Sequence, residues 1–570
     1  DLTHFPLVNE AGMMSAVTPT LHGDTKTGQN TFLTLPVSVE DLHNTRSARN
    51  FWVYVDGFGP WSVTGNSAPQ IAETFAADSP ETVTLEAGLL WHKVTRRNAR
   101  LGLAAEITNF VPAGDDQVEL MQVTLTNIGP APLTLTPTAA IPIYGRSADN
   151  LRDHRHVTSL LHRIRAVRHG VVVQPTLTFD ERGHRPNTVT YAVLGAAGDS
   201  APPTAFFPVV EDFIGEGGNL EWPQAVLMPD VPGLPAGAAM DGYEAIGALR
   251  FADVTLAPGE SRTYVLVLAA LADDSGASGI EPLGGHSRHA EKPAEASTPE
   301  QFLIQRYGNA ARFAEWLDRT RDHWQARVAP LAFRTADPDF DRWLKWVTVQ
   351  PYLRRLFGNS FLPYHDYGRG GRGWRDLWQD CLALLMLEPE PVRDLLFNSF
   401  AGVRMDGSNA TIIGSRPGEF LADRNNIPRV WMDHGAWPYL TTRLYIDRSG
   451  DLGFLLQEQA YFKDLHINRC QAKDEAWAPE QGTQLRTRTG EVAHGSVLEH
   501  LLVQHLTAFF NAGAAGNILL EGADWNDGMD MARERGESVA FTALYAGNLA
   551  ELSELVLALS RLGIAEVELA

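Results

Sequence analysis

The sequence predicts a multidomain protein of α and β structure, with a β-sandwich in its first half and helices in its second. Residues 1 to about 270 are rich in Thr, Val, Leu, Pro and Gly, and contain stretches in which apolar and polar residues alternate. Such alternation, interrupted by frequent turn residues, is typical of the short strands of a sandwich. From residue 337 onward, apolar residues recur at helical spacing, which predicts a separate helical region.

The clearest strand pattern lies in Glu119–Asn127, where Met121, Val123 and Leu125 alternate with polar residues. A break rich in Gly and Pro over residues 128–132 separates it from a second alternating stretch that begins at Leu133. We expect these two stretches to pair as a hairpin. Further strands are expected at Glu81–Leu85, Gly170–Phe179 and Arg262–Leu268. This spacing predicts a large β-sandwich over residues 1–271.

Residues 272–336 are expected to be a linker that contains a helix. Its first part, 272–298, holds Asp, Ser, Gly, Ala, Pro and Glu with almost no apolar pattern. Thr298-Pro299-Glu300-Gln301 combines a capping residue, a proline suited to the first helical position and a glutamine three residues after the cap. A helix is therefore expected from here to about Ala329. Further helices are expected to begin at Asp337 and to span Ser496–Asn511, within a domain that covers residues 337–570.

Composition and charge narrow the class of protein. The 570 residues include 47 Lys and Arg against 69 Asp and Glu, a formal charge of −22, which argues against binding to nucleic acid or to an anionic membrane. The two cysteines, Cys381 and Cys470, exclude a disulfide scaffold and a cysteine zinc site. With no long apolar run and no secretory signal, we expect a cytoplasmic protein. The chain starts at Asp1 and ends in a helical pattern, so we expect it to be part of a longer polypeptide.

Two segments interrupt the helical pattern with polar and aromatic residues. The first, Tyr364–Asp380, begins as a Gly-rich loop with arginines and continues as a helix that carries Asp376 and Asp380 on one face. A helix N-terminus with arginines near it attracts anions such as phosphate. The glycines do not match a Walker loop, which argues against nucleotide binding. The alternative is an exposed loop followed by a helix with ordinary capping carboxylates.

The second segment is Glu521–Asp530, where several carboxylates surround Trp525. A carboxylic acid beside an aromatic surface is suited to act as a proton donor, and tryptophan offers a flat face to a sugar ring. The spacing of Asp and Asn also resembles half of a calcium loop, but the position for its last ligand holds Arg535. A structural turn is a further alternative, since Asp, Asn and Gly are turn residues. A third polar and aromatic stretch, 416–434, is suited to line a cleft but names no reaction.

The two segments together resemble a known family. Asp524-Trp525-Asn526-Asp527-Gly528, followed by Arg535-Gly536-Glu537-Ser538-Val539, resembles the signature of glycoside hydrolase family 94, the inverting phosphorylases of β-linked glucosides. Gly373–Asp380 resembles the Gly-Phe-Arg-Asp…Gln-Asp segment of the same family, with Trp374 in place of the usual Phe. The resemblance implies a large N-terminal β-sandwich, a helical linker and a C-terminal (α/α)6 barrel, of which this chain holds only a part. Stretches such as Leu35–Leu42 and Ser47–Trp52 look most like the 1,2-β-oligoglucan phosphorylase branch.

The resemblance also implies roles for individual residues. Asp527 would be the general acid and Arg375 would face phosphate. The glucosyl ring would be bound by Arg369, Asp376, Trp525 and Asp524. No metal and no cofactor is implied, because inorganic phosphate is a co-substrate. The family's remaining phosphate ligands, a histidine and a Thr or Ser, would lie in a further C-terminal segment of the same protein.

The expected function is therefore the inverting phosphorolysis of β-linked gluco-oligosaccharides, with β-1,2-glucan as the preferred substrate. The partners implied are the oligosaccharide, inorganic phosphate and a second copy of the chain, since the family often dimerises through its β domain; neither nucleic acid nor membrane is among them. One alternative is a phosphate-independent inverting hydrolase or a transglycosylase domain of a cyclic β-1,2-glucan synthase. The other is a glucan-binding protein without catalytic activity.

Overall fold

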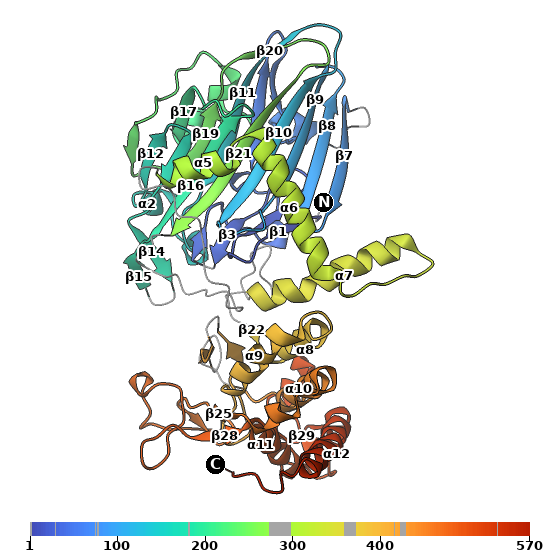
Figure 1. Ribbon diagram of the computed structural model, residues 1–570. Helices are drawn as coiled ribbons and strands as arrows, with labels where there is room; N and C mark the ends of the chain where they lie inside the picture. The colour runs from blue at the N-terminus through green and yellow to red at the C-terminus, as the bar shows by residue number, and fades with distance from the viewer. Residues whose placement is uncertain are drawn as a thin grey trace. The chain divides into compact units, whose positions relative to one another are not determined.

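The computed structural model consists of two compact units, which are described separately (Figure 1). It describes residues 3–28, 30–74, 76, 79–180, 183–272, 298–357, 372–414, 417–421, 429–532 and 534–569. Within this part of the chain, the first unit comprises residues up to 272 together with 298–326, and the second comprises 327–357 and the residues from 372 on. The low-complexity part of the expected linker lies outside the described residues.

Two large antiparallel sheets form the first unit. In order across the nine-stranded sheet, its strands are β18 (Ala239–Asp241), β12 (Arg163–Val167), β13 (Gly170–Val173), β16 (Val189–Ala197), β21 (Ser261–Ala272), β10 (Val118–Asn127), β9 (Leu103–Phe110), β8 (Trp91–Asn98) and β7 (Glu81–Gly88). The six-stranded sheet consists of β17 (Ala205–Val209), β19 (Ala245–Arg250), β11 (Leu133–Ile143), β5 (Asn50–Val55) and β6 (Gly59–Ser62), with β20 (Val254–Leu256) paired to β11.

Smaller elements complete this unit. The short strands are β1 (Phe5–Val8), β2 (Met14–Val17), β3 (Thr25–Gly28) and β4 (Thr31–Phe32), which form one sheet, and the pair β14 (Leu177–Asp180) and β15 (Gly183–Pro186). The short helices are α1 (Ala68–Glu73), α2 (Arg155–Ser159), α3 (Val210–Ile214) and α4 (Gln224–Leu227). Gly170–Phe179, expected as one strand, is divided between β13 and β14.

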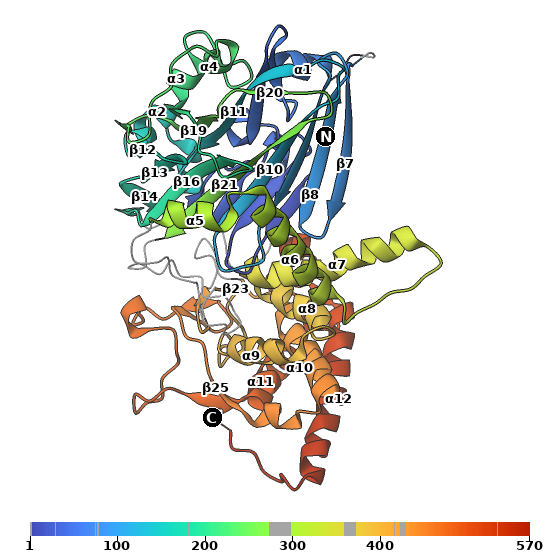
Figure 2. The ribbon, with the colours of Figure 1, turned by 45° about the horizontal axis from the view of Figure 1, so that its top comes forward.

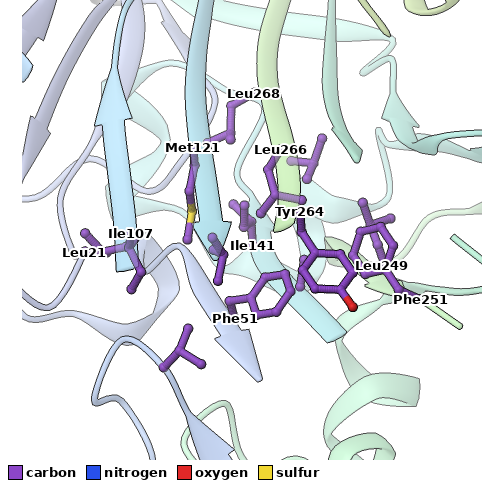
Figure 3. Packing of buried hydrophobic residues seen from close by; sticks show 14 of the residues in the cluster. Leu21, Phe51, Ile107, Met121, Ile141, Leu249, Phe251, Tyr264, Leu266 and Leu268 are labelled. Atoms are coloured by element: carbon purple, nitrogen blue, oxygen red, sulfur yellow. The ribbon is translucent and has the colours of Figure 1, made fainter. Parts of the chain in front are cut away.

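The core of the first unit lies between the two large sheets (Figure 3). Phe51 on β5 and Ile141 on β11 pack with Met121 on β10 and with Tyr264 and Leu266 on β21, all buried. Each such side chain contributes about 1.5–3 kcal/mol by leaving water. This packing between the inner faces of two sheets confirms the predicted N-terminal β-sandwich.

The hairpin expected from the Glu119–Asn127 pattern is wrong. β10 and β11 are consecutive in the chain but belong to different sheets, because β10 pairs with β9 and β21, while β11 pairs with β5, β19 and β20. The connection over residues 128–132 holds two prolines, and it carries the chain from one sheet to the other. Alternating patterns identify strands correctly, but they do not identify the partner of each strand.

The helix expected from Thr298 to about Ala329 is two helices, α5 (Pro299–Tyr307) and α6 (Ala310–Val328). The start is as predicted: the Thr298 hydroxyl accepts a hydrogen bond from the Gln301 backbone, and the Gln301 side chain accepts one from the Thr298 backbone. Gly308 ends α5. In Figure 2, α5 lies across β16 and β21. Tyr307 belongs to a cluster of apolar residues that covers the outer face of the nine-stranded sheet. The central strands of this sheet are therefore buried on both faces.

The second unit is mainly helical. Its helices are α7 (Pro338–Phe357), α8 (Trp374–Leu384), α9 (Pro389–Phe400), α10 (Ala436–Ser449), α11 (Val497–Phe510) and α12 (Val539–Arg561). Short strand pairs link them: β22 (Arg372–Gly373) with β23 (Ile412–Ile413) and β24 (Phe420–Leu421), β25 (Glu458–Ala460) with β28 (His494–Ser496), β26 (His466–Ile467) with β27 (Ala472–Lys473), and β29 (Ile518–Leu519) with β30 (Glu537–Ser538). A β-sandwich followed by helices is thus confirmed, while the (α/α)6 barrel stays a prediction.

None of the helices in the described part of the chain combines the length and the apolar character needed to cross a bilayer.

Candidate active site

The described parts of both motif segments, 372–380 and 521–530, lie in the second unit, and a buried tryptophan fixes the first of them. Trp374 opens α8 and is 1% exposed. Its backbone N–H donates to the Thr411 carbonyl at 2.9 Å, and its indole N–H donates to the His434 carbonyl at 3.0 Å. Because both the backbone and the indole of Trp374 are held, the position of the next residue, Arg375, at the start of the helix is fixed.

Arg375 is the residue on which the two motifs meet. Its Nη2 donates to Oδ1 of Asp527, 152 residues further along the chain. Its Nη1 lies 3.4 Å from Asp433 Oδ2 and 3.4 Å from the Asp524 carbonyl oxygen. The guanidinium carbon also lies 6.0 Å from the centre of the Trp431 ring and 5.8 Å from that of Trp525. Two carboxylates and two indoles therefore surround one cation, a geometry in which cation–π attraction adds to ion pairing.

The loop that carries Asp527 is fixed through its backbone. Glu521 has a left-handed φ of 54°, and the next residue, Gly522, donates its N–H to the Val430 carbonyl at 2.9 Å. Asp524 uses both carboxylate oxygens within this region, accepting from the Asn526 backbone N–H at 2.8 Å and from the Ser538 hydroxyl at 3.0 Å. The side chain of Asp524 thus ties the loop to the start of α12.

Asp527, by contrast, faces solvent. It is the first residue of the 3-10 turn η7 (Asp527–Ala532), and its side chain is 66% exposed. Oδ1 accepts hydrogen bonds from Arg375 and from the Trp431 indole, the latter at 3.0 Å. An exposed carboxyl group that two neighbours orient can reach an external substrate, which is the geometric requirement for a general acid.

The remaining predicted sugar-binding residues lie on and beside α8. Asp376 and Asp380 share one face, as predicted, and both approach Arg354 of α7, which lies 3.7 Å from Asp376 Oδ1 and donates to Asp380 Oδ2 at 2.8 Å. Burial raises the pKa of Asp380, although Arg354 opposes the shift. The Trp525 indole, 56% exposed overall, contacts Gln379 Oε1 at 3.5 Å. Arg369 lies outside the described residues.

One site residue was missed by the sequence reasoning. Asp433, in the 3-10 turn η4 (Met432–Gly435), has a side-chain exposure of 0% and accepts a hydrogen bond from the Trp437 indole at 2.8 Å. Burial raises the pKa of Asp433 to about 6, with Arg375 opposing the shift. The only signal was its place in the polar, aromatic stretch 416–434, whose residue types did not distinguish it from its neighbours.

A metal site is the remaining alternative for this region. Among the residues that the structure describes, no three or more His, Cys, Asp or Glu side chains are grouped so as to hold a metal ion. His434 is buried, and its ring stacks on Trp431 with the centres 5.2 Å apart. Burial holds the pKa of His434 well below its usual value. This histidine therefore supports the indole that binds Asp527.

Comparison with known proteins links the sequence to a family of carbohydrate-active enzymes. Residues 84–286 match the model of the glycosyl hydrolase 94 supersandwich domain. The cyclic beta-(1,2)-glucan synthase NdvB of Rhizobium meliloti (strain 1021) is 24% identical over 333 residues, which are 58% of this chain. The match spans only 10% of the length of that synthase.

Two solved structures match parts of the chain with TM-scores below 0.5. A bacterial glucoamylase complexed with acarbose has a TM-score of 0.43 and 9% identity, covering 78% of this chain and 55% of its own. A GalM/aldose epimerase homologue from C. elegans has a TM-score of 0.27 and 12% identity, covering 47% of this chain and 99% of its own. The supersandwich match confirms the resemblance that the two motifs indicated. The chain therefore resembles glycoside hydrolase family 94.

Proposed function

We propose that this chain takes part in the inverting phosphorolysis of β-linked gluco-oligosaccharides, with Asp527 as general acid. The observation that carries the proposal is the contact between Arg375 and Asp527, which joins an exposed proton donor to a cation suited to bind phosphate. The match to a glycosyl hydrolase 94 domain supports activity on a glycosidic bond. The name of the relative, a β-1,2-glucan synthase, supports β-1,2-glucan as the substrate.

In this mechanism the glycosidic bond breaks between the anomeric carbon and the leaving oxygen. Asp527 gives its proton to that oxygen and regains one from solvent. A phosphate oxygen, held by Arg375, forms the new bond from the opposite face of the ring, so that α-glucose 1-phosphate and a shortened glucan result. Trp525 would border the glucosyl ring, and Asp376 would bind its hydroxyls together with Arg369. Asp524 would act indirectly, because its carboxylate holds the loop that carries Asp527.

The buried position of Asp433 argues against its acting as the base of an inverting hydrolase. An inverting hydrolase needs a second carboxylate, roughly 6.5–9.5 Å from the acid, to activate a water molecule. Asp433 is the other carboxylate on Arg375, but its side chain is 0% exposed and is not placed to activate an external water. A phosphorylase needs only the acid, because phosphate is already a nucleophile.

A second candidate is a transglycosylating domain of a cyclic β-1,2-glucan synthase. It is favoured by one observation, the 24% identity to NdvB. Such a domain would use the same acid and the same sugar-binding residues, but another sugar hydroxyl would take the place of phosphate as the acceptor. The two functions therefore differ in their dependence on phosphate.

The test is to incubate the full-length protein with β-1,2-gluco-oligosaccharides, with and without inorganic phosphate, and to measure glucose 1-phosphate. We expect release that requires phosphate and that falls by about 10²–10⁴-fold in Asp527→Asn. The matched control is Asp530→Asn in the same turn, whose carboxylate pairs with Arg429 at 3.4 Å and is not assigned a role. Sugar products formed without phosphate would favour the transglycosylase, and glucan binding without any product would favour a binding protein.

A further inference from the structure

The environment of Asp433 is unusual for a buried carboxylate, because only one of its two oxygens has partners. Oδ2 accepts from the Trp437 indole at 2.8 Å and lies 3.4 Å from Arg375 Nη1. Oδ1 is buried and makes no hydrogen bond. A buried charge whose hydrogen-bonding capacity is half used is costly, so this carboxylate gains less from its surroundings than a fully paired one would.

Arg375 separates this buried carboxylate from the open side of the site. The arginine side chain is 11% exposed, while Asp433 behind it is 0% exposed and Asp527 in front of it is 66% exposed. An anion that binds Arg375 from the exposed side must therefore share the guanidinium with Asp433 and with Asp527. The charge of Asp433 both holds the arginine in place and reduces its attraction for a second anion.

We propose that Asp433 is a positioning residue for Arg375 whose negative charge sets the affinity of that arginine for anions. The proposal deepens the proposed function and rests on it in one respect, that Arg375 is taken as the group that faces phosphate. Binding of an anion and binding of a proton to Asp433 are then coupled, and the coupling is reciprocal. Protonation of Asp433 strengthens anion binding, and anion binding favours protonation.

The groups that face Asp433 come from several elements. Arg375 approaches from α8, Trp437 from α10, Asp524 from the loop after β29 and Tyr545 from α12. Asp527 does not contact Asp433 directly in this set, but it accepts a hydrogen bond from Arg375, which lies beside both carboxylates. Burial raises the pKa of Tyr545, so this phenol stays neutral near neutral pH. Asp433 itself, with a pKa raised to about 6 by burial, changes charge between about pH 5 and pH 7.5.

The experiment measures sulfate binding to the whole chain by isothermal titration calorimetry at about pH 5 and pH 7.5. Sulfate is the probe because it stays a dianion over this range, whereas phosphate itself titrates. For the wild-type chain we expect about tenfold tighter binding at the lower pH, which corresponds to one pKa unit of coupling. Arg375→Gln is expected to abolish the binding that depends on pH.

Two variants at position 433 separate the charge from the hydrogen bonds. Asp433→Asn keeps an oxygen that can accept from both Arg375 and Trp437, so we expect it to bind sulfate at both pH values as tightly as the wild type does at the lower one. Asp433→Leu removes the acceptors, and we expect weaker binding at both pH values. Glu388→Gln is the matched control: it removes another largely buried carboxylate, which pairs with Arg355 at 3.4 Å, and should leave the pH dependence unchanged.

The proposal is overturned if Asp433→Asn keeps the wild-type pH dependence, if the wild type shows none, or if sulfate does not bind. Melting curves of the variants identify any that fail to fold, and Asp433→Asn, the most conservative change, carries the decisive comparison. Sulfate binding needs neither a sugar nor a proton donor. If the chain binds sulfate as expected but the full-length protein releases no glucose 1-phosphate, the proposed function is refuted and this inference stands.

Discussion

One buried arginine–carboxylate pair in the β-sandwich and one in the helical unit are completed differently. In the β-sandwich, Arg49 and Glu119 are both 0% exposed and form two parallel hydrogen bonds, of 2.6 and 2.9 Å. In the helical unit, Arg375 contacts Asp433 through a single nitrogen at 3.4 Å, and its other terminal nitrogen turns to the exposed Asp527. We call the first pair closed, because the arginine and the carboxylate are joined by two hydrogen bonds away from solvent. We call the second pair open, because its arginine also contacts an exposed carboxylate.

The hydrogen bonds around each carboxylate explain the difference. Glu119 also accepts from the hydroxyls of Ser15 and Thr25, at 2.7 and 2.8 Å. Burial would raise the pKa of Glu119, but Arg49 and these hydroxyls lower it below its usual value. Asp433 lacks such partners on one oxygen, and its pKa is raised. An ion pair whose hydrogen-bonding capacity is filled stabilises the fold. An ion pair whose capacity is only partly filled leaves charge to which a ligand can bind.

The largest effect is expected from breaking the closed pair. Glu119→Ala leaves Arg49 charged and buried without its partner, which typically costs about 3–5 kcal/mol. We expect the free energy of unfolding of the chain, measured by urea denaturation, to fall by this amount. Asp199→Asn is the control, since Asp199 forms an exposed pair with Arg262 at 2.8 Å and should cost less than about 1 kcal/mol. Equal effects of the two substitutions would contradict the comparison.

Sequence reasoning predicted local features of the chain, but it predicted neither of these ion pairs. The capping box at Thr298 was predictable, because it depends on residues three positions apart. The partner of β10 was not, because alternation is the same whichever strand lies beside it. In the site, a motif resemblance pointed to Arg375 and Asp527. Asp433 carries no local pattern, and its proposed role depends on burial and on a contact with a residue 58 positions away in the chain.

A smaller effect, which sharpens the comparison, is the part of the pH dependence of stability that comes from Asp433. Its pKa is about 6 in the folded chain against the ordinary value of 3.8, so the folded state binds the proton more tightly. The contribution is fully present below about pH 4 and is lost as pH rises through 6, which amounts to about 3 kcal/mol. Urea unfolding of the wild type and of Asp433→Asn from about pH 4 to pH 7.5 measures it as the difference between the two curves.

In this comparison, the other titrating groups are common to both proteins and cancel. The wild type should lose stability relative to Asp433→Asn as the pH rises. A constant difference would mean that Asp433 does not take up a proton on folding, and a difference that grows in favour of the wild type would reverse the sign. Glu119→Gln provides the contrast, because the pKa of Glu119 is lowered and the stability due to its charge should instead be lost on acidification.

The smallest effect on stability is expected at Asp527, although it contacts the same arginine as Asp433. Its carboxylate is 66% exposed, so water replaces the ion pair when the charge is removed, and Arg375 keeps its contact with Asp433. Asp527→Asn should therefore change the free energy of unfolding by less than about 1 kcal/mol, measured by urea denaturation at neutral pH. A loss comparable to that of Glu119→Ala would mean that Asp527 belongs to the packing of the loop. Because a proton donor must stay free to meet its substrate, a small effect on folding is what its proposed role requires.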